Sequence, residues 1–421
     1  MNRSRAGAVP VTGTEPRDLP RDTELLGLPG VAIPGRMPGR LPRELLAPGS
    51  LLLAGAAPGR PVSWAEHLLL WGAHPRMEID RLVELVAAQG VVGAGGAGFP
   101  TDRKLASLVG SRVSHVIVNA AEGETASGKD GVLLGHVPHL VLDGAVIAAR
   151  ALGAPRVVIR ISADRPDLAG SLPRAVAARG DAVPIEVSVG PASFVAGEAS
   201  AVIRSIAGCP ALPDDLGRPP ALPGRLGRRR SRVLLSNAET FARIALAARE
   251  IGSQSALASI SGAVRRPGVV ELPESATLAE LVDVGGLVGS PRVLITGGWH
   301  GRWVRWDWLS AGTGVTRSAL VTLGGRWGAG AFVWLPDDLN TWDALAGITR
   351  ELANGSAGQC GPCWRGLPAL ADVIERHAGS AADRAAIEGL MRQVDGRGIC
   401  AHPSAAVAAV RSALDLIGAD R

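Results

Sequence analysis

Short strand-like segments alternate with helix-length segments through the first half of the chain, and this alternation most restricts the fold. The stretch SHVIVNAAEGE, which begins at Ser114, is typical of a buried strand that ends in a polar loop. Further strands are expected at 156–161 and 185–189, with helices at 140–152 and 168–179 before them. Strands that alternate with helices predict an α/β fold with a largely parallel sheet.

The composition and the hydrophobic periodicity change three times along the chain, and these changes predict the domain organisation. Residues 1–50 are rich in Pro, Gly and Arg and are expected to form an irregular extension, followed by the α/β domain at 51–252. Short strands with one short helix then predict a β-grasp-like domain at 253–335. Helical periodicity in four segments predicts a helical domain at 336–421.

Composition and cysteine usage exclude several classes of protein. The chain is 47% hydrophobic and 20% charged, as globular proteins are. It has neither an apolar run long enough to span a membrane nor an N-terminal leader pattern. Four cysteines are too few for a disulfide framework and favour a reducing compartment, so we expect a cytoplasmic protein. The basic run at 228–230 lacks interleaved aromatic residues, so no nucleic-acid partner is expected.

A glycine-rich loop, GAGGAGFP, is the first candidate binding element. Gly93, Gly95 and Gly98 satisfy the pattern G-x-G-x-x-G, but a helix is expected before the loop, which argues against a Rossmann NAD site. A backbone without side chains still allows a flat ring or a phosphate to approach closely. Lys104 follows on the next helix, where its charge would meet an anion or a reduced flavin. A tight turn with a surface lysine is the alternative.

Three polar side chains follow the first expected strand in the stretch NAAEGET. Asn119, Glu122 and Glu124 would lie at the carboxyl end of that strand, where ligands of α/β sheets bind. The two carboxylates would accept hydrogen bonds from ribose hydroxyls, and acids of a solvated loop are the alternative. Lys104 and Lys129 are the only lysines among 44 basic residues, which hints that a compact ammonium is needed here.

Three of the four cysteines form another candidate site. Cys360 and Cys363 are a C-x-x-C pair in SAGQCGPCWRG, and Cys400 follows Cys363 by 37 residues. Thiols spaced in this way are typical of iron–sulfur proteins. A zinc ion held by the same three thiols and His402 is an alternative. Cys209, in AGCPALP, is expected to be a small buried hydrophobic residue.

Together these motifs resemble those of the flavin- and NADH-binding subunit of respiratory complex I and of related NAD-reducing hydrogenases and formate dehydrogenases. GAGGAGFPTDRK is similar to the flavin loop G-R-G-G-A-G-F-P-T-G-x-K, and VNAAEGETASGKDG to C-N-A-D-E-x-E-P-G-x-x-K-D-R. FVAGEASAVIRSIAG is similar to Y-x-C-G-E-E-T-A-L-x-x-S-x-x-G. SAGQCGPCWRG is similar to the cluster motif S-C-G-x-C-x-P-C-R-x-G. The matches follow the family order over residues 60–418.

The resemblance implies a flavin-binding α/β domain, a soluble-ligand-binding β-grasp domain and a four-helix iron–sulfur domain. It implies electron transfer from NADH through flavin mononucleotide (FMN) to an iron–sulfur cluster. By position, the FMN contacts would be Gly93, Gly96, Lys104, Asn119, Gly197, Glu198, Asn237 and Thr240. The NADH contacts would be Phe99, Glu124, Phe194 and Arg218, and Glu122 completes the cofactor-binding set. No side chain is implied as a catalytic acid or base.

Several positions depart from the family motifs. The residues that replace polar family residues are Ala94, Ala121, Phe194, Ala199 and Ser236. Each replacement removes a polar contact worth about 1–2 kcal/mol. Ala357 stands in place of the first cluster cysteine, which leaves three thiols for a [4Fe–4S] or a [3Fe–4S] cluster.

Three functions therefore remain open from the sequence. The first is a redox-active subunit that passes electrons from NADH through FMN to the cluster. The second is a degenerate paralogue with a structural or interaction role in a redox complex, and the third is a zinc-binding relative. The resemblance also implies a redox partner, either a thioredoxin-like [2Fe–2S] subunit or another iron–sulfur or membrane electron carrier. The chain itself would be cytoplasmic and would reach the membrane only through such partners.

Overall fold

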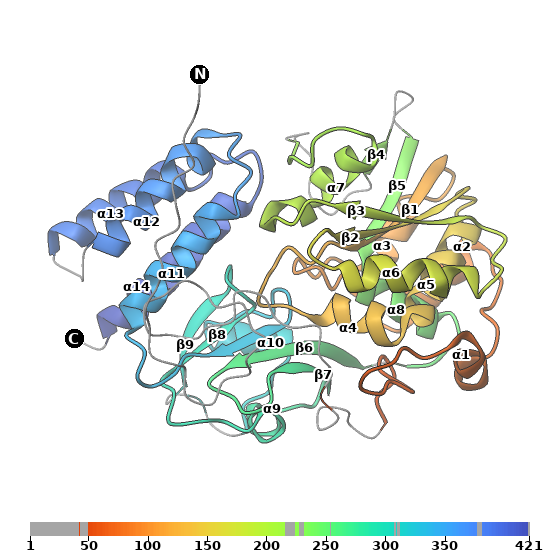
Figure 1. The fold of residues 1–421 in the computed structure, drawn as a ribbon, viewed down its shortest axis with the longest axis horizontal. Coiled ribbons are helices and arrows are strands. Elements are labelled where there is room, and N and C mark those ends of the chain that lie inside the picture. Colours follow the sequence, from red (N-terminus) through yellow and green to blue (C-terminus); the bar gives the residue numbers. More distant parts are fainter. Residues whose placement is uncertain are drawn as a thin grey trace.

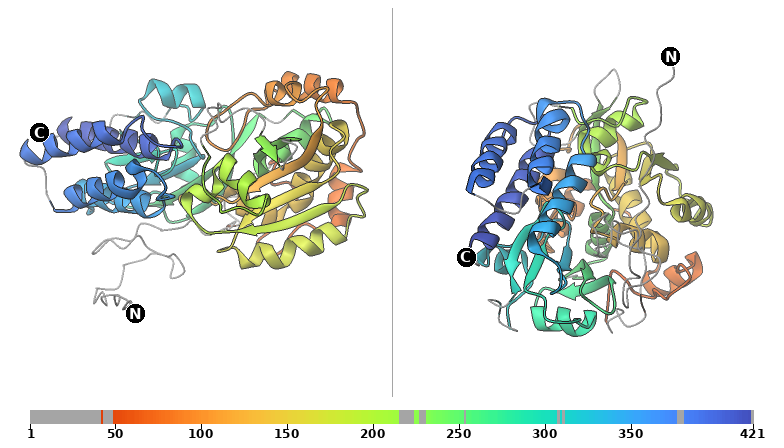
Figure 2. Two further views of the ribbon diagram at one scale, coloured as in Figure 1. Left: turned by 90° about the horizontal axis from the view of Figure 1, so that it is seen from above. Right: turned by 60° about the vertical axis from the view of Figure 1, so that its left-hand side comes forward.

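Three groups of elements follow one another along the chain in the computed structural model, which describes residues 42, 49–214, 224–226, 231–252, 254–306, 309, 312–376 and 381–419. An α/β group comes first, a second sheet with short helices follows, and a helical bundle ends the chain (Figure 1). The bundle and the α/β group lie at opposite ends of the long axis (Figure 2).

The first sheet has the strand order β3-β2-β1-β5-β4. Its strands are β1 (Val113–Ala120), β2 (Val157–Ser162), β3 (Ile185–Gly190), β4 (Gly224–Leu226) and β5 (Ser231–Asn237). β3, β2, β1 and β5 pair in parallel, whereas β4 pairs with β5 in antiparallel fashion. The predicted α/β fold with a largely parallel sheet is therefore confirmed.

Helices cover both faces of this sheet. They are α1 (Trp64–Trp71), α2 (Ile79–Ala88), α3 (Thr101–Ala106), α4 (Lys129–His136), α5 (Pro138–Ala151), α6 (Pro166–Ala177), α7 (Ala199–Ile206) and α8 (Ala238–Ala247). α5 and α8 pack on one face with most of the apolar core, and Val202 and Ile203 of α7 pack on the other against Ile117. α5 approaches α8 closely because Gly144 has no side chain: a Cβ there would lie 1.8 Å from Phe241 O.

The second sheet is mixed and has the order β7-β6-β10-β8-β9. Its elements are β6 (Ser255–Gly262), β7 (Gly268–Pro273), α9 (Leu278–Gly285), β8 (Val293–Thr296), β9 (Arg302–Arg305), α10 (Arg317–Thr322) and β10 (Ala331–Trp334). β10 runs parallel to β6, and the other pairs are antiparallel. Phe332 and Trp334 of the central strand are fully buried in the core of this group. A mixed sheet crossed by short helices agrees with the β-grasp-like prediction.

The last group is a bundle of four helices. They are α11 (Thr341–Asn354), α12 (Leu367–Arg376), α13 (Ala381–Val394) and α14 (His402–Ala419), and a π-helical turn at Pro362–Gly366 leads into α12. Leu367, Ile374, Ile387 and Val410 are fully or almost fully buried between the helices. The predicted four-helix domain is present, and the three thiols lie in the turns that precede α12 and α14.

The sequence does not predict every element. β5 is missed because its short apolar run follows a Gly/Pro-rich segment, and α4 is missed because its sequence, KDGVLLGH, contains two glycines. The expectation for Cys209 is wrong, since this residue is exposed in the turn after α7. The predicted domain boundaries remain a prediction; they fall between α8 and β6 and between β10 and α11. The predicted extension at 1–50 lies almost wholly outside the described residues.

No single helix among the described residues is long and apolar enough to cross a membrane. Only α4 and α5 taken together reach that length, and they meet at a bend of 95°.

A buried carboxylate holds the α/β helices together. Asp143 of α5 is fully buried, and it contacts His67 at 2.9 Å, Arg179 at 2.7 Å and Arg249. Burial acts to raise the pKa of Asp143, but these contacts outweigh burial and hold that pKa below its usual range. The carboxylate therefore joins α1, α5 and the ends of α6 and α8 as a charged group.

We expect Asp143→Ala to destabilise the protein by about 3–5 kcal/mol, because it removes the buried carboxylate that Arg179 and Arg249 share and leaves Arg249 without a carboxylate partner among the described residues. Because the folded-state pKa of Asp143 lies below the unfolded value of about 3.9, this stabilisation is complete above about pH 4 and is lost as the pH falls further. Urea unfolding at pH 7 measures the loss. Arg81→Ala, which breaks exposed ion pairs with Glu84 and Glu250, is the control and should change little. Equal effects of the two substitutions would contradict this account.

Candidate functional site

The glycine loop is closed on itself by its backbone. Gly93 N donates to Phe99 O at 2.8 Å. Gly96 and Gly98 have φ of 109° and 64°, a region that residues with side chains rarely adopt. α2 precedes the loop and α3 follows it, as the sequence predicts. The loop is therefore not the strand-to-helix turn of a Rossmann site.

The loop lies between α8 and the second sheet. Ala94 N donates to Thr240 Oγ1 at 3.0 Å, so the start of α8 fixes one side. A Cβ on Gly96 would lie 3.7 Å from the carbonyl carbon of Gly328, on the second sheet's side. Gly95 is exposed, so bare backbone remains accessible to a ligand.

Lys104 is a half-buried cation without a carboxylate partner among the described residues. Its Nζ donates to Leu235 O at 3.1 Å. Burial lowers the pKa of the ammonium group. A carbonyl oxygen satisfies one of its three N–H donors, so the charge is available to an anion. This arrangement fits the phosphate or the reduced ring of FMN.

The second lysine, Lys129, forms contacts within the protein that stabilise the fold. Lys129 is buried at the start of α4, and its Nζ contacts Asn237 Oδ1 at 2.8 Å and Glu239 Oε2 at 3.0 Å. Although burial opposes the charge, Asp130 and Glu239 raise the pKa of Lys129. Asn237 Oδ1 also accepts from Glu239 N, which caps α8. The Asn237 side chain is thus held by the protein itself.

Asn119 joins the end of β1 to the turn before α7. Its Nδ2 donates to Gly197 O at 2.8 Å, and its Oδ1 accepts from Ala121 N at 3.3 Å. Asn237 Nδ2 in turn donates to Asn119 O at 3.4 Å. A Cβ on Gly95 would lie 3.8 Å from Asn237 Cβ. Four segments that carry predicted FMN contacts therefore converge: the glycine loop, the end of β1, the turn before α7 and the start of α8.

Glu122 is used as a helix cap. It has a φ of 44°, and its carboxylate accepts from Asp130 N at 2.9 Å, Gly131 N at 3.1 Å and Ser127 Oγ at 3.1 Å. Burial and the neighbouring Asp130 raise the pKa of Glu122 to about 7. The carboxylate stabilises the first turn of α4, and its role as a cofactor contact stays a prediction.

Glu124 ties the first group of elements to the second. One carboxylate oxygen accepts from Ala126 N at 3.1 Å and the other from Trp299 N at 3.0 Å. Burial raises the pKa of Glu124 to about 7. The side chain thus crosses between the sheets, and its predicted contact with NADH is untested.

Phe194 touches both of the other groups. Its ring centroid lies 4.5 Å from that of His300, before β9, and 5.3 Å from that of His402, at the start of α14. The two imidazole rings are 4.9 Å apart. His300 Nε2 and His402 Nδ1 are buried and make no hydrogen bond within the described part of the chain. No local pattern in the sequence predicts this aromatic contact among three domains.

The remaining predicted cofactor contacts differ in where they lie. Glu198 caps α7 by accepting from Ser200 N at 2.8 Å and Ala201 N at 3.0 Å. Phe99 is half-buried at the end of the glycine loop. Arg218 lies outside the described residues.

The three thiols are close enough to influence one another. Burial, a hydrogen bond with Cys360 and the nearby Cys400 raise the pKa of Cys363 to about 12. Burial likewise raises the pKa of Cys400. Iron would bind these residues as thiolates, so binding would release their protons. Ala357 is half-buried in the loop that precedes Cys360.

The zinc alternative finds no support among the described residues. His402 Nε2 bonds to Leu352 O at 2.8 Å, and the ring packs on Phe194. In the described part of the chain, no group of three or more His, Cys, Asp or Glu side chains is arranged to hold one metal ion. A cluster does not require such convergence, because its thiolates bind separate iron atoms.

Two family models match the chain in the order of these sites. The Nuo51 FMN-binding domain matches residues 86–246, and the NADH-ubiquinone oxidoreductase-F iron-sulfur binding region matches residues 343–419. The chain belongs to the F-type flavoprotein family of NADH-quinone oxidoreductase. The expected FMN, iron–sulfur cluster and NADH are supported, and so is NADH-oxidising electron transfer through FMN to iron–sulfur.

The chain is a divergent member of this family. It is 27% identical over 368 residues to the F 2 subunit of NADH-quinone oxidoreductase of Rhizobium meliloti (strain 1021), covering 80% of this chain and 86% of that protein. It is 27% identical over 378 residues to the F subunit of the Escherichia coli (strain K12) enzyme, covering 80% and 82%.

The fold resembles that of an NAD⁺-reducing [NiFe]-hydrogenase solved in the H₂-reduced state. The TM-score is 0.72 at 24% identity, over 85% of this chain and 64% of the hydrogenase chain. The air-oxidised state gives a TM-score of 0.71 at 25% identity, over 81% and 62%. This chain therefore spans less than two thirds of the hydrogenase chain.

Gly123, in the loop after β1, packs against the turn before α7. A Cβ on Gly123 would lie 2.1 Å from Phe194 O. We expect Gly123→Ala to destabilise the protein by about 1–3 kcal/mol, because both partners are backbone and must shift. Thermal unfolding measures the effect. Gly170→Ala, on α6 with open space around it, is the control and should be neutral or stabilising. If Gly123→Ala kept full stability, this would contradict the close packing of Gly123 against the Phe194 backbone.

Proposed function

We propose that this protein oxidises NADH at an FMN bound beside the glycine loop, and passes the electrons to a cluster held by Cys360, Cys363 and Cys400. The observation that carries the proposal is the Lys104 ammonium, which lies without an acid among the described residues, next to the four converging segments. Bound FMN accepts two electrons as a hydride and gives them up singly, which suits it to join NADH to a cluster.

The role of the chain's own residues is to bind and position the flavin. The bare backbone around Gly95 lets a flat ring approach, and Lys104 offsets negative charge there. Asn119 donates a hydrogen bond to Gly197 O, which fixes the end of β1 against the turn before α7. No acid or base is assigned, because hydride transfer needs placement and not a proton relay.

The departures from the family motifs lower the affinity for FMN. Ala121 presents a methyl group toward Gly197, since a Cβ on Gly197 would lie 3.6 Å from that of Ala121. An aspartate at this position would place a carboxylate there, so one polar contact to the cofactor is lost. We propose that FMN is held more weakly than in relatives with the full motif, and that Lys104 contributes most of the remaining polar binding.

We further propose that the chain works in a heteromeric assembly. Its relatives carry the names of subunits of NADH-quinone oxidoreductase. A thioredoxin-like [2Fe–2S] subunit, or another iron–sulfur or membrane electron carrier, is the partner that suits single-electron output. The chain would then lie in the cytoplasm, at the membrane only through its partners.

Anaerobic purification followed by absorption spectroscopy and metal analysis tests cofactor binding. We expect a flavin absorbance band, iron and sulfide. Stoichiometric zinc, or the absence of both flavin and iron, would contradict the proposal and would favour a structural role in a redox complex.

We expect Lys104→Met to weaken FMN binding by about 10- to 100-fold, because hydrogen bonds to charged groups contribute about 1.5–3 kcal/mol. Quenching of FMN fluorescence on titration with apoprotein measures the affinity. Arg103→Met, a neighbouring exposed cation on α3, is the matched control and should leave binding unchanged. Equal effects of both substitutions would show that general charge, and not Lys104, attracts the flavin.

We expect Ala357→Cys to slow the loss of iron in air, because it supplies a fourth thiolate to a three-thiol cluster. Iron content over time, with the decay of the cluster's visible absorbance, measures the change. Cys209→Ser removes the exposed cysteine of the α/β group and should leave the iron content as it is. An unchanged decay rate in Ala357→Cys would contradict the assignment of residue 357 to the missing ligand position.

A further inference from the structure

A second concave site lies away from the glycine loop and the thiols, between β9 and the C-terminal helix α14. It is a cavity of about 410 Å³. Its polar lining residues are Arg302, Arg305, Arg411, Ser412 and Asp415. Leu323, from the loop after α10, closes one side. The redox function described above uses none of these residues.

The cavity carries unbalanced positive charge. Arg302 Nη1 is buried and has no hydrogen-bond partner among the described residues. Burial lowers the pKa of Arg302, and the nearby Arg326 and Arg411 lower it further. Three arginines line this cavity against one carboxylate, that of Asp415. A buried unpaired donor beside two like charges costs free energy that a bound anion would offset.

Packed elements carry Arg302 and Arg411. Trp303 N donates to Ser412 Oγ at 2.9 Å, which fixes β9 against α14 between Arg302 and Arg411. Ser412 Oγ also donates to Trp303 O at 3.3 Å. Trp303 is buried. The cations are therefore attached to packed secondary structure, unlike solvated arginines on mobile loops.

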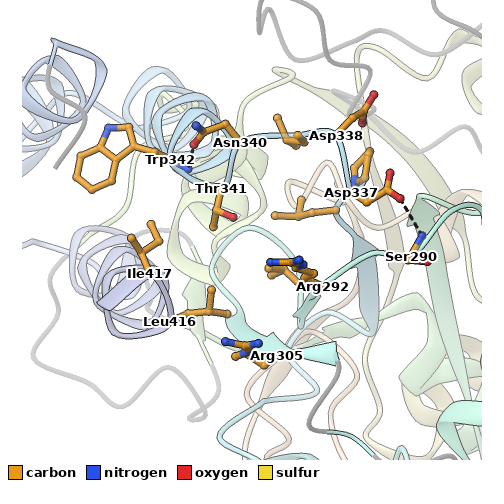
Figure 3. Close-up of a pocket in the computed structure, with 14 residues that line it drawn as sticks. Ser290, Arg292, Arg305, Asp337, Asp338, Asn340, Thr341, Trp342, Leu416 and Ile417 are labelled. Atoms are coloured by element: carbon orange, nitrogen blue, oxygen red, sulfur yellow. Dashed lines mark hydrogen bonds between the residues drawn. The ribbon is translucent and has the colours of Figure 1, made fainter. Parts of the chain in front are cut away.

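A larger neighbouring cavity of about 750 Å³ shares Arg305 and Leu416 with the first. Figure 3 shows Arg292 and Arg305 on its strand side and Leu416 and Ile417 on its α14 side. Thr341, at the start of α11, lines the opposite side, where its hydroxyl oxygen would accept hydrogen bonds from hydroxyl groups. Together the cavities offer a cationic end for an anion and a roomier end for an organic group.

We propose that this pair of cavities binds a phosphorylated, hydroxyl-bearing small molecule, with the phosphate at Arg302 and Arg411. Guanidinium groups match phosphate oxygens with two parallel N–H donors, so arginines at both positions suit a phosphate. Cavities of this size at the junction of two domains are typical of small-molecule sites. The site is independent of the proposed electron transfer, and an occupant would bridge the second sheet and the bundle.

Isothermal titration calorimetry of the full chain with ribose 5-phosphate at low ionic strength tests the site. We expect saturable binding at one molecule per chain. Arg302→Gln and Arg411→Gln should each weaken binding at least 10-fold, as loss of a charged hydrogen bond does. Arg411 is exposed, so its variant should fold even if Arg302→Gln does not. Arg376→Gln, an exposed arginine on α12, should leave binding unchanged.

Three outcomes would overturn the proposal. The first is the absence of saturable binding to the wild-type chain. The second is equal weakening by Arg376→Gln, which would show attraction by general charge. The third is weakening by Lys104→Met and not by Arg411→Gln, which would place the phosphate at the flavin site. Affinity for inorganic phosphate equal to that for ribose 5-phosphate would overturn the assignment of an organic ligand.

Discussion

The end of β1 is the constraint on which the rest of the structure depends. Within a few residues, Asn119 bonds to the turn before α7, Glu122 caps α4, and Glu124 reaches the second sheet. A Cβ on Gly123 would clash with the carbonyl of Phe194, whose ring contacts both histidines. This short loop therefore contacts the first two groups of elements, and Phe194 beside it contacts the bundle.

This arrangement explains how a divergent chain retains a cofactor site. Glu122 and Glu124, which the sequence suggests as ligands, accept hydrogen bonds from backbone N–H groups of the protein. Burial raises the pKa of both carboxyl groups to about 7. What remains for a ligand is bare glycine backbone and the Lys104 ammonium, which has no acid partner among the described residues. The polar residues that this chain lacks are side chains that would contact a cofactor directly, whereas those that build the loop are kept. The proposed function therefore predicts that the cofactor is still positioned but is bound with reduced affinity.

Much of the fold was predictable because it rests on local periodicity. The alternation of buried strands with helices predicts the parallel sheet, and the four apolar repeats after residue 340 predict the bundle. Long-range contacts leave no such signal: Glu124 and Trp299 are 175 residues apart in sequence. The scarcity of lysine distinguishes Lys104 and Lys129 in the sequence, but only the structure shows that Lys129 is paired with Glu239 within the fold. The predicted cofactor contacts themselves remain predictions.

The central claim is that NADH delivers electrons through the glycine-loop site to the three-thiol site. Anaerobic addition of NADH to the purified protein, followed by absorption and low-temperature electron paramagnetic resonance, tests it most directly. We predict loss of the oxidised flavin absorbance together with a new signal from a reduced iron–sulfur cluster. A protein that contains both flavin and iron but shows neither change with NADH, while dithionite produces both, would contradict the claim.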